Sequence, residues 1–240
     1  NINTNGKIQR VATQTKPKSK NGWYVVHVTN QGIVAIFGDH AKNCKPIKWT
    51  NITKASQNQY VALKNKIIQT KIENALEKKF LLEKINLFYS KEVRPMILFH
   101  KYLDQKNLTE LDFNNFNDPL SVTNDNKLVI PIRNISGELM GLQTIDADGK
   151  KLMLKGSQKE GNFYTISNKG INLKNAEIIF IGEGFSTMAS IHIAAHKISN
   201  EIRICSIMAI DVYNIEDVLN NIIQHNSNPR IILVADNDCA

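Results

Sequence analysis

The sequence predicts an α+β fold that ends in an α/β part with a Rossmann-like parallel sheet. Three observations lead to this prediction. Short runs of alternating bulky residues fill residues 22–49, and the apolar period becomes helical between Tyr60 and Tyr89. From residue 171 onward, short apolar strands alternate with helices, which is the pattern of a parallel sheet.

The first segment, residues 1–58, is predicted to be a small, basic, β-rich N-terminal region that binds DNA. Its aromatic residues lie among lysines, an arrangement that suits base stacking beside phosphate neutralisation. These residues are Trp23, Tyr24, Phe37 and Trp49 among Lys20, Lys42, Lys45 and Lys48. Trp23 and Lys48 are the candidate DNA contacts. Packing of the aromatic residues into a small core is the alternative reading.

Residues 59–95 are predicted to be a helical connector, formed by one long helix or two in tandem. Apolar residues recur there at helical spacing, with most lysines off the stripe. The stripe consists of Val61, Ile68, Ile72, Ala75 and Leu76. Pro95 ends the helical pattern. The helix could be a spacer, a DNA-facing surface or a packing arm.

Residues 96–170 are predicted to be a second β-rich module, which opens with a short helix in HKYLDQKNL. Four runs, LVIPIRN, GELMGLQTI, KLMLKG and NFYTI, then indicate a β-meander with glycine-containing turns between them. Pro131 lies inside the first run. Because proline lacks the N–H that a sheet ladder needs, its strand should be an edge strand or contain a bulge.

Residues 171–240 place three carboxylates where parallel strands end. Glu183 follows the apolar run IIFIG, and Asp236 and Asp238 follow RIILVA. Ligands gather at the carboxyl ends of parallel strands, and carboxylate oxygens suit Mg²⁺ or Mn²⁺. The sequence therefore predicts a metal site for phosphoryl chemistry. Asp211, which follows the strand between them, is a further candidate.

A helix cap is the plainer alternative at this position. An acidic residue at a strand end is common, and Ser186 or Thr187 could cap the helix that follows Glu183. The combination of three carboxylates on two predicted strands is what favours the metal site over this reading.

Composition narrows the class of protein. Up to Lys106 the sequence has 19 Lys and Arg against 6 Asp and Glu, and the remainder has 11 against 16. This asymmetry favours a polyanion-binding region joined to a metal-binding region, although solvated lysines would give the same counts. Three scattered cysteines without a C-x-x-C pair predict a reduced, cytoplasmic protein without a zinc site. No apolar run is long enough to predict a membrane span.

Several segments together resemble one family of enzymes. The order apolar strand–Glu–Gly, helix, strand, helix, strand–Asp-x-Asp is similar to the Toprim domain of primases, topoisomerases and some nucleases. EGFSTMASIH (residues 183–192) resembles plasmid, integrative-element and satellite-phage primases, and it departs from the aromatic–Met–Asp of bacterial replicative primases. Residues 129–166 resemble the module that precedes Toprim in those proteins. LFHKYLDQKNL, NGWYVVHV and GIVAIFGD extend the resemblance toward the N-terminus.

The resemblance implies a DNA primase, a nucleotidyltransferase of mobile genetic elements that acts on single-stranded DNA and nucleoside triphosphates with Mg²⁺ or Mn²⁺. Glu183, Asp236 and Asp238 would be the catalytic and metal-binding residues. The residues expected to bind nucleotide or DNA are Arg133, Lys150, Lys151 and Lys155. The Toprim part would be truncated at its C-terminus, and a helicase domain or protein would be a further partner.

Two other functions remain open at this stage. A Toprim centre can support DNA cleavage, as in topoisomerases or overcoming-lysogenisation-type nucleases, although no tyrosine stands out as a topoisomerase nucleophile. The chain could also be a non-catalytic fragment that binds single-stranded DNA.

Overall fold

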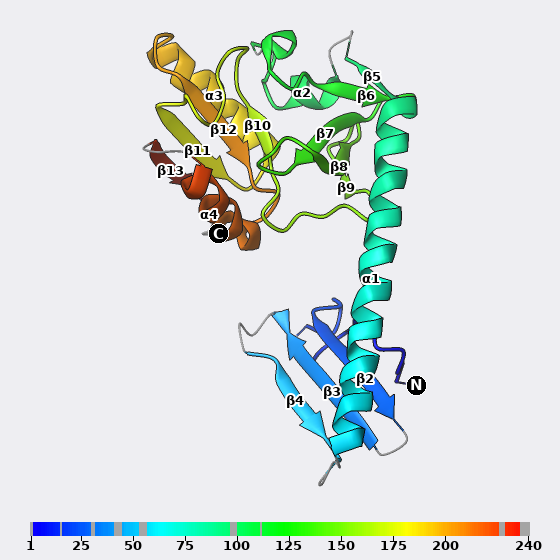
Figure 1. The fold of residues 1–240 in the computed structure, drawn as a ribbon. Coiled ribbons are helices and arrows are strands. Elements are labelled where there is room, and N and C mark those ends of the chain that lie inside the picture. Colours follow the sequence, from blue (N-terminus) through cyan, green and yellow to red (C-terminus); the bar gives the residue numbers. More distant parts are fainter. Residues whose placement is uncertain are drawn as a thin grey trace. The chain divides into compact units, whose positions relative to one another are not determined.

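The computed structural model describes residues 2–14, 16–29, 32–40, 45–52, 57–96, 100–110, 112–225 and 229–235. These residues form a mixed fold of helices and three sheets, which confirms the predicted α+β class. The chain divides into two compact units, Asn1–Lys79 and Phe80–Ala240. One long helix, α1 (Gln57–Glu92), begins in the first unit and ends in the second (Figure 1).

The N-terminal unit is built on a four-stranded antiparallel sheet. Its strands are β1 (Gln9–Val11), β2 (Gly22–Thr29), β3 (Gly32–Asp39) and β4 (Ile47–Thr50), in that spatial order. The bulky alternation in β2 and β3 predicted these two strands, and the structure confirms them. The sheet places Tyr24 opposite Phe37 and Phe37 opposite Ile47, so these residues lie in one row across it.

Helix α1 is a single helix of 36 residues, and not two in tandem. No proline or glycine interrupts it, and Pro95 follows within the short strand β5 (Val93–Pro95). Its last turns pack against the second unit through Ile85, which is 3% exposed. The apolar stripe on its earlier turns is exposed, with Leu76 62% accessible. No helix in the described part of the chain is long and apolar enough to cross a bilayer.

The second unit opens with a five-stranded antiparallel sheet. Strands β5, β6 (Ser121–Thr123), β7 (Leu128–Arg133), β8 (Leu139–Ile145) and β9 (Lys151–Met153) follow one another in space as in sequence. Helix α2 (Lys101–Gln105) and a 3-10 turn (Phe113–Asn115) lie between β5 and β6. Three of the four predicted meander strands are thus confirmed.

The fourth run was assigned to the wrong sheet. It forms β10 (Tyr164–Ile166), which pairs antiparallel with β12 (Ile204–Met208) of the third sheet. Buried Tyr164 and Ile166 belong to the core that lies between that sheet and α3 (Phe185–Ile198). Alternation showed that the run was a strand, but long-range burial determined its partner.

Pro131 occupies a central strand, so the predicted edge position is wrong. Strand β6 pairs β7 only at Leu128 and Val129, and Pro131 lies beyond that paired stretch. Leu142, which stands opposite Pro131 on β8, directs its carbonyl oxygen to the backbone N–H of Leu154, so the missing N–H removes no bond from the β7–β8 ladder. The predicted irregularity is present one residue later, where the register shifts between Ile132 and Arg133.

The third sheet has the order β10-β12-β11-β13, in which β11 (Ile178–Gly182) runs parallel to both β12 and β13 (Arg230–Val234). Alternate residues of β11 and β12 face different helices. Ile179, Ile181, Cys205 and Ile207 pack with α4 (Ile215–His225), whereas Met208 packs with α3. The predicted alternation of apolar strands and helices is therefore confirmed, and it places the carboxyl ends of three strands at one edge.

Two residues predicted to be structural are buried in this unit. Cys205 is fully buried, and burial raises the pKa of its thiol to about 12, so it behaves as a small apolar residue. His192 is 1% exposed, its Nδ1 lies 3.3 Å from Ser206 Oγ, and its ring meets that of His196. Burial and then the charge of His196 lower the pKa of His192 to about 3. The His192 side chain therefore folds in its neutral form.

This buried histidine should make the stability of the second unit depend on pH. Its unfolded pKa is near 6.5 and its folded pKa is lower, so the unfolded chain binds the proton first as the pH falls. We expect the contribution of His192 to the free energy of unfolding to be complete above pH 6.5. By pH 4.5 this contribution should fall by about 2 kcal/mol.

Thermal melts between pH 7 and 4.5 measure this effect. His192→Asn should flatten the decline of the melting temperature, whereas His225→Asn, at the exposed end of α4, should leave it unchanged. Equal slopes in all three proteins would show that His192 does not determine the acid sensitivity.

Candidate functional site

Glu183 lies at the carboxyl end of β11, where the three parallel strands finish together. Gly182 stands opposite Met208 of β12 and Val234 of β13. Glu183 is half-buried, and its side chain makes no hydrogen bond or ion pair with any residue that the structure describes. The carboxylate is therefore available to a ligand at this edge of the sheet.

Gly182 allows the surrounding elements to approach closely. A Cβ on this residue would lie 2.5 Å from Met188 Sδ and 3.2 Å from the carbonyl oxygen of Val234. Since real Cβ atoms do not come within 3.0 Å of another atom, Met188 would have to move. The glycine before Glu183 thus permits the end of β11 to pack directly against α3 and β13.

Helix α3 begins at Phe185, two residues after Glu183. Gly184 is its N-cap residue, and no side chain caps the helix. The alternative that Ser186 or Thr187 caps this helix is therefore wrong, because both residues lie inside the first turn. The first backbone N–H groups of a helix favour negative charge, and here they begin one residue beyond the Glu183 carboxylate.

Lys151 is the predicted basic residue that approaches this point. Its Nζ atom lies 3.7 Å from the position that a Cβ on Gly184 would occupy. Lys151 and Ser186 also line a pocket of about 330 Å³ together with Lys106 and Asp148. Lys106 belongs to no motif, and Ser186 was considered only as a helix cap, so neither was predicted to lie at this pocket. The structure thus places Lys151 beside Gly184, the residue after Glu183, although Lys151 and Glu183 are 32 positions apart in the sequence.

Asp236 and Asp238, the two predicted metal ligands of the last strand, lie outside the described residues. The described backbone ends at Ala235, directly after β13, which runs parallel to β11 and beside it. Within the described residues, no group of three or more His, Cys, Asp or Glu side chains is gathered as a metal ion would require. Of the three predicted metal ligands, Glu183 is the one that lies within the described residues.

Arg133 is held by an ion pair away from Glu183. Its Nε lies 2.5 Å from Asp118 Oδ2, its Nη2 lies 3.1 Å from Oδ1, and its Nη1 donates to the Gly137 carbonyl. The hydrogen bond to Asp118 raises the pKa of Arg133. Arg133 pairs with Phe163, the residue before β10. Strand β12 lies between β10 and β11, so Arg133 is on the far side of β12 from the strand that ends at Glu183. Lys150 and Lys155, the other predicted contacts, are exposed in loops beside β9.

Asp211 lies at the same edge of the sheet, after β12. Its Oδ2 forms an ion pair with Lys159, and its Oδ1 is buried without a hydrogen-bond partner among the described residues. The residue before it, Ile210, has φ +78°, which is unfavourable for a β-branched residue. The backbone thus turns sharply where β12 leaves the sheet, and Asp211 is turned toward Lys159.

The predicted DNA contacts of the N-terminal unit lie on one face of its sheet. Strand alternation places Trp23 and Lys48 on the face that also holds His27, whose burial and nearby Lys66 on α1 lower its pKa. The Trp23 ring covers Gly38. Lys42 lies outside the described residues.

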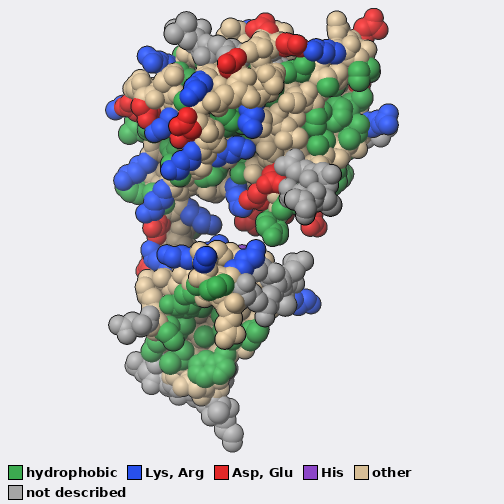
Figure 2. All heavy atoms as spheres, turned by 180° about the vertical axis from the view of Figure 1, so that it is seen from behind, with side chains coloured by type: hydrophobic (Ala, Val, Ile, Leu, Met, Phe, Trp, Pro, Cys, Tyr) green, Lys and Arg blue, Asp and Glu red, His purple; other side chains and the backbone are tan. Residues whose placement is uncertain are grey.

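The opposite face holds the exposed aromatic residues of this sheet. Trp49 is 50% exposed, Phe37 39% and Ile47 57%, and apolar side chains gather on this unit in Figure 2. A pocket of about 490 Å³ lies beside them and includes Lys45. We define Phe37, Ile47 and Trp49 as the open aromatic face. Trp23, one of the two predicted contacts, also lines this pocket, whereas Lys48 does not.

No protein-family model matches the sequence, and no solved structure matches the chain. We therefore infer the function from the residues at the end of β11 and on the open aromatic face.

Proposed function

We propose that the protein synthesises short oligonucleotide primers on single-stranded DNA as a metal-dependent nucleotidyltransferase with a Toprim-type centre. The observation that supports this most strongly is the position of Glu183. It lies at the end of β11, beside the parallel strand β13, whose sequence continues into Asp236 and Asp238. Parallel strands with helices on both faces agree with the resemblance of residues 171–240 to Toprim domains.

Glu183 fits a divalent cation because its carboxylate is half-buried and has no protein partner among the described residues. Asp236 and Asp238 would supply the other oxygen ligands. When bound, Mg²⁺ or Mn²⁺ would polarise the α-phosphate of a nucleotide and lower the pKa of the attacking 3′-hydroxyl.

The remaining contribution of the chain is positive charge beside that carboxylate. Lys151 Nζ approaches Gly184, where the uncapped N-terminus of α3 begins. An ammonium group and free backbone N–H groups both stabilise the negative charge of a triphosphate. In this proposal Lys151 orients the incoming nucleotide, and Glu183 binds the divalent cation.

The N-terminal unit would hold the template. The open aromatic face offers rings on which bases can stack, and the basic side chains of this half of the sequence would neutralise phosphates. Binding through such contacts weakens steeply as salt rises.

Trp49→Ala is expected to weaken single-stranded DNA binding about tenfold, because base–aromatic stacking contributes roughly 1–3 kcal/mol per base. Fluorescence anisotropy of a labelled oligonucleotide measures this change. Tyr213→Ala is the control, since Tyr213 is 78% exposed in the other unit. Equal affinity of Trp49→Ala and the unaltered protein would exclude the open aromatic face as the DNA contact.

The proposed activity is tested by incubating the protein with single-stranded templates, labelled nucleoside triphosphates, and Mg²⁺ or Mn²⁺. Short labelled products that are missing with Asp236→Asn would support primer synthesis at this site. Absence of product with either metal on several templates would contradict it. Incision of labelled DNA without nucleotides would instead identify a nuclease.

A further inference from the structure

The first half of α1 carries a row of exposed apolar side chains. Val61, Ile68, Ile72 and Leu76 are 48%, 44%, 48% and 62% exposed, and all four belong to the N-terminal unit. Single exposed apolar residues are ordinary on protein surfaces, but a row that continues over about four helical turns marks a surface that a partner covers. The row is therefore a candidate interaction surface.

This row lies on the side of α1 that points away from the N-terminal sheet (Figure 1). On the sheet side, Lys66 Nζ donates to a backbone carbonyl oxygen of β2. Thr70 is close to the chain there as well, since a Cβ on Gly6 would lie 3.3 Å from Thr70 Cγ2. Residues two positions apart on a helix point about 200° apart, so Ile68 and Ile72 both face away from that contact. A partner could cover the row without displacing the sheet.

The spacing along this side of the helix is that of a coiled coil. From residue 61 to residue 75, steps of four and three residues alternate, as the a and d positions of a heptad do. In this register the seam consists of Val61, Asn65, Ile68, Ile72 and Ala75. Thr70 and Glu77 then occupy f positions, which lie farthest from the seam. Their contacts with Gly6 and Lys7 on the sheet side agree with this register.

Asn65 indicates that the partner is a second copy of this helix. It occupies an a position, it is exposed, and it is the polar residue of an otherwise apolar seam. Two parallel copies in register place this asparagine opposite itself, so that each amide can hydrogen-bond the other. An apolar groove on a different protein would leave the amide buried and unpaired, at a cost of about 1–3 kcal/mol.

The charges beside the seam favour the parallel orientation. Lysines occupy three successive g positions, Lys64, Lys71 and Lys78. In an antiparallel pair the g residues of the two copies face one another, which would oppose lysine to lysine and cost free energy. In a parallel pair each g residue faces an e residue of the other copy, and Gln69 and Leu76 occupy these positions opposite Lys64 and Lys71.

We propose that the protein pairs with a second copy of itself through a parallel coiled coil of α1, with residues 61–75 in register. The seam is only about two heptads long, which is small for a stable interface, but the helix is already held by its own sheet and needs no ordering. The dimer should therefore be weak, with a dissociation constant on the order of 10 µM. Each dimer would carry two open aromatic faces, and pairing itself requires neither DNA nor chemistry at Glu183.

Sedimentation velocity of the whole chain tests the proposal, at concentrations from well below to well above the expected dissociation constant. Ile72→Glu places a charge in the seam and should raise the dissociation constant more than about 100-fold, because the charge would lose its water. Ile223→Glu is the matched control, since Ile223 is 55% exposed on α4 of the other unit. It should leave the dimer unchanged.

Asn65→Ile should act in the opposite direction. A polar residue at an a position lowers the stability of a coiled coil, so its replacement should tighten the dimer about tenfold, a gain that misfolding would not produce. A protein that stays monomeric throughout this range, or a dimer that Ile72→Glu leaves intact or Asn65→Ile fails to tighten, would overturn the proposal. Co-sedimentation of a monomer with anionic lipid vesicles, lost in Ile72→Glu, would overturn it in favour of a membrane surface.

Discussion

Glu183→Gln is expected to lower the rate of primer synthesis about 10³-fold while leaving the affinity for single-stranded DNA unchanged. Glutamine has the same shape as glutamate but lacks the negative charge that a divalent cation requires. A group that stabilises charge in a transition state typically contributes 10²–10³-fold, and loss of metal would add to this. Initial rates at saturating template measure the effect.

Glu177→Gln is the matched control for this prediction. Glu177 precedes β11 at the opposite end of the same strand, where its carboxylate accepts from the backbone N–H of Arg203 at 3.0 Å. Glu177 also forms an exposed ion pair with Arg203, and such a pair contributes at most about 1 kcal/mol to stability. Its replacement should therefore change the rate of primer synthesis less than about threefold. Comparable losses in the two variants would indicate that β11 matters for folding and that Glu183 is not catalytic.

Gly182→Ala should destabilise the second unit by about 1–3 kcal/mol. The added methyl would lie 2.5 Å from Met188 Sδ and 3.3 Å from Val234 Cβ, and Met188 is fully buried. Overpacking of this kind forces side chains away from their preferred rotamers or shifts the backbone. Because β11 would move relative to β13, primer synthesis should fall together with stability. Urea denaturation gives the stability change directly.

Gly184→Ala separates this packing effect from the general cost of replacing a glycine. Its Cβ would meet only Lys151 Nζ at 3.7 Å and Thr187 Oγ1 at 3.8 Å, and its φ of −105° suits any residue. We expect a change within about 0.5 kcal/mol. Equal destabilisation by both substitutions would contradict the close packing inferred at Gly182.

Much of the fold could be predicted from local patterns. The apolar runs of β11 and β12 are largely buried between helices, so their sequences are apolar almost throughout, and the helix of 36 residues contains no proline or glycine. Strand partners could not be predicted in the same way. The run that forms β10 alternates like the meander strands before it, and only its contacts with β12 place it in another sheet.

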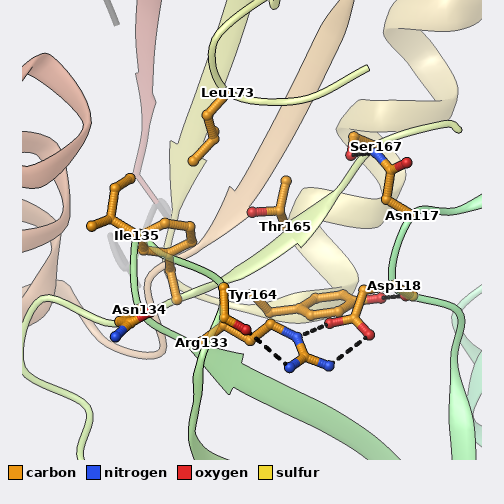
Figure 3. Close-up of a pocket in the computed structure, with 11 residues that line it drawn as sticks. Asn117, Asp118, Arg133, Asn134, Ile135, Tyr164, Thr165, Ser167 and Leu173 are labelled. Carbon is orange, nitrogen blue, oxygen red and sulfur yellow. Dashed lines mark hydrogen bonds and ion pairs between the residues drawn. The ribbon is translucent and has the colours of Figure 1, made fainter. Parts of the chain in front are cut away.

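One residue of the candidate site, Glu183, could be predicted from its local sequence. Glu183 follows an apolar strand and precedes a glycine, so its position at a sheet edge could be inferred. The surrounding charges could not be inferred, because they depend on tertiary contacts. Arg133 is engaged by Asp118, 15 residues earlier (Figure 3), whereas Lys151 reaches Gly184 from another sheet. In the sequence Arg133 was the stronger candidate of the two, because it lies inside an apolar strand.

The location of the metal tests the central claim most directly. Crystals of the protein grown with Mn²⁺ and a nucleoside triphosphate would reveal the ion by its anomalous scattering. The proposed function predicts a peak about 2.1 Å from carboxylate oxygens of Glu183 and Asp236, at the carboxyl ends of β11 and β13. Manganese bound only elsewhere, with Glu183 facing solvent, would contradict a nucleotidyl-transfer centre at this edge of the sheet.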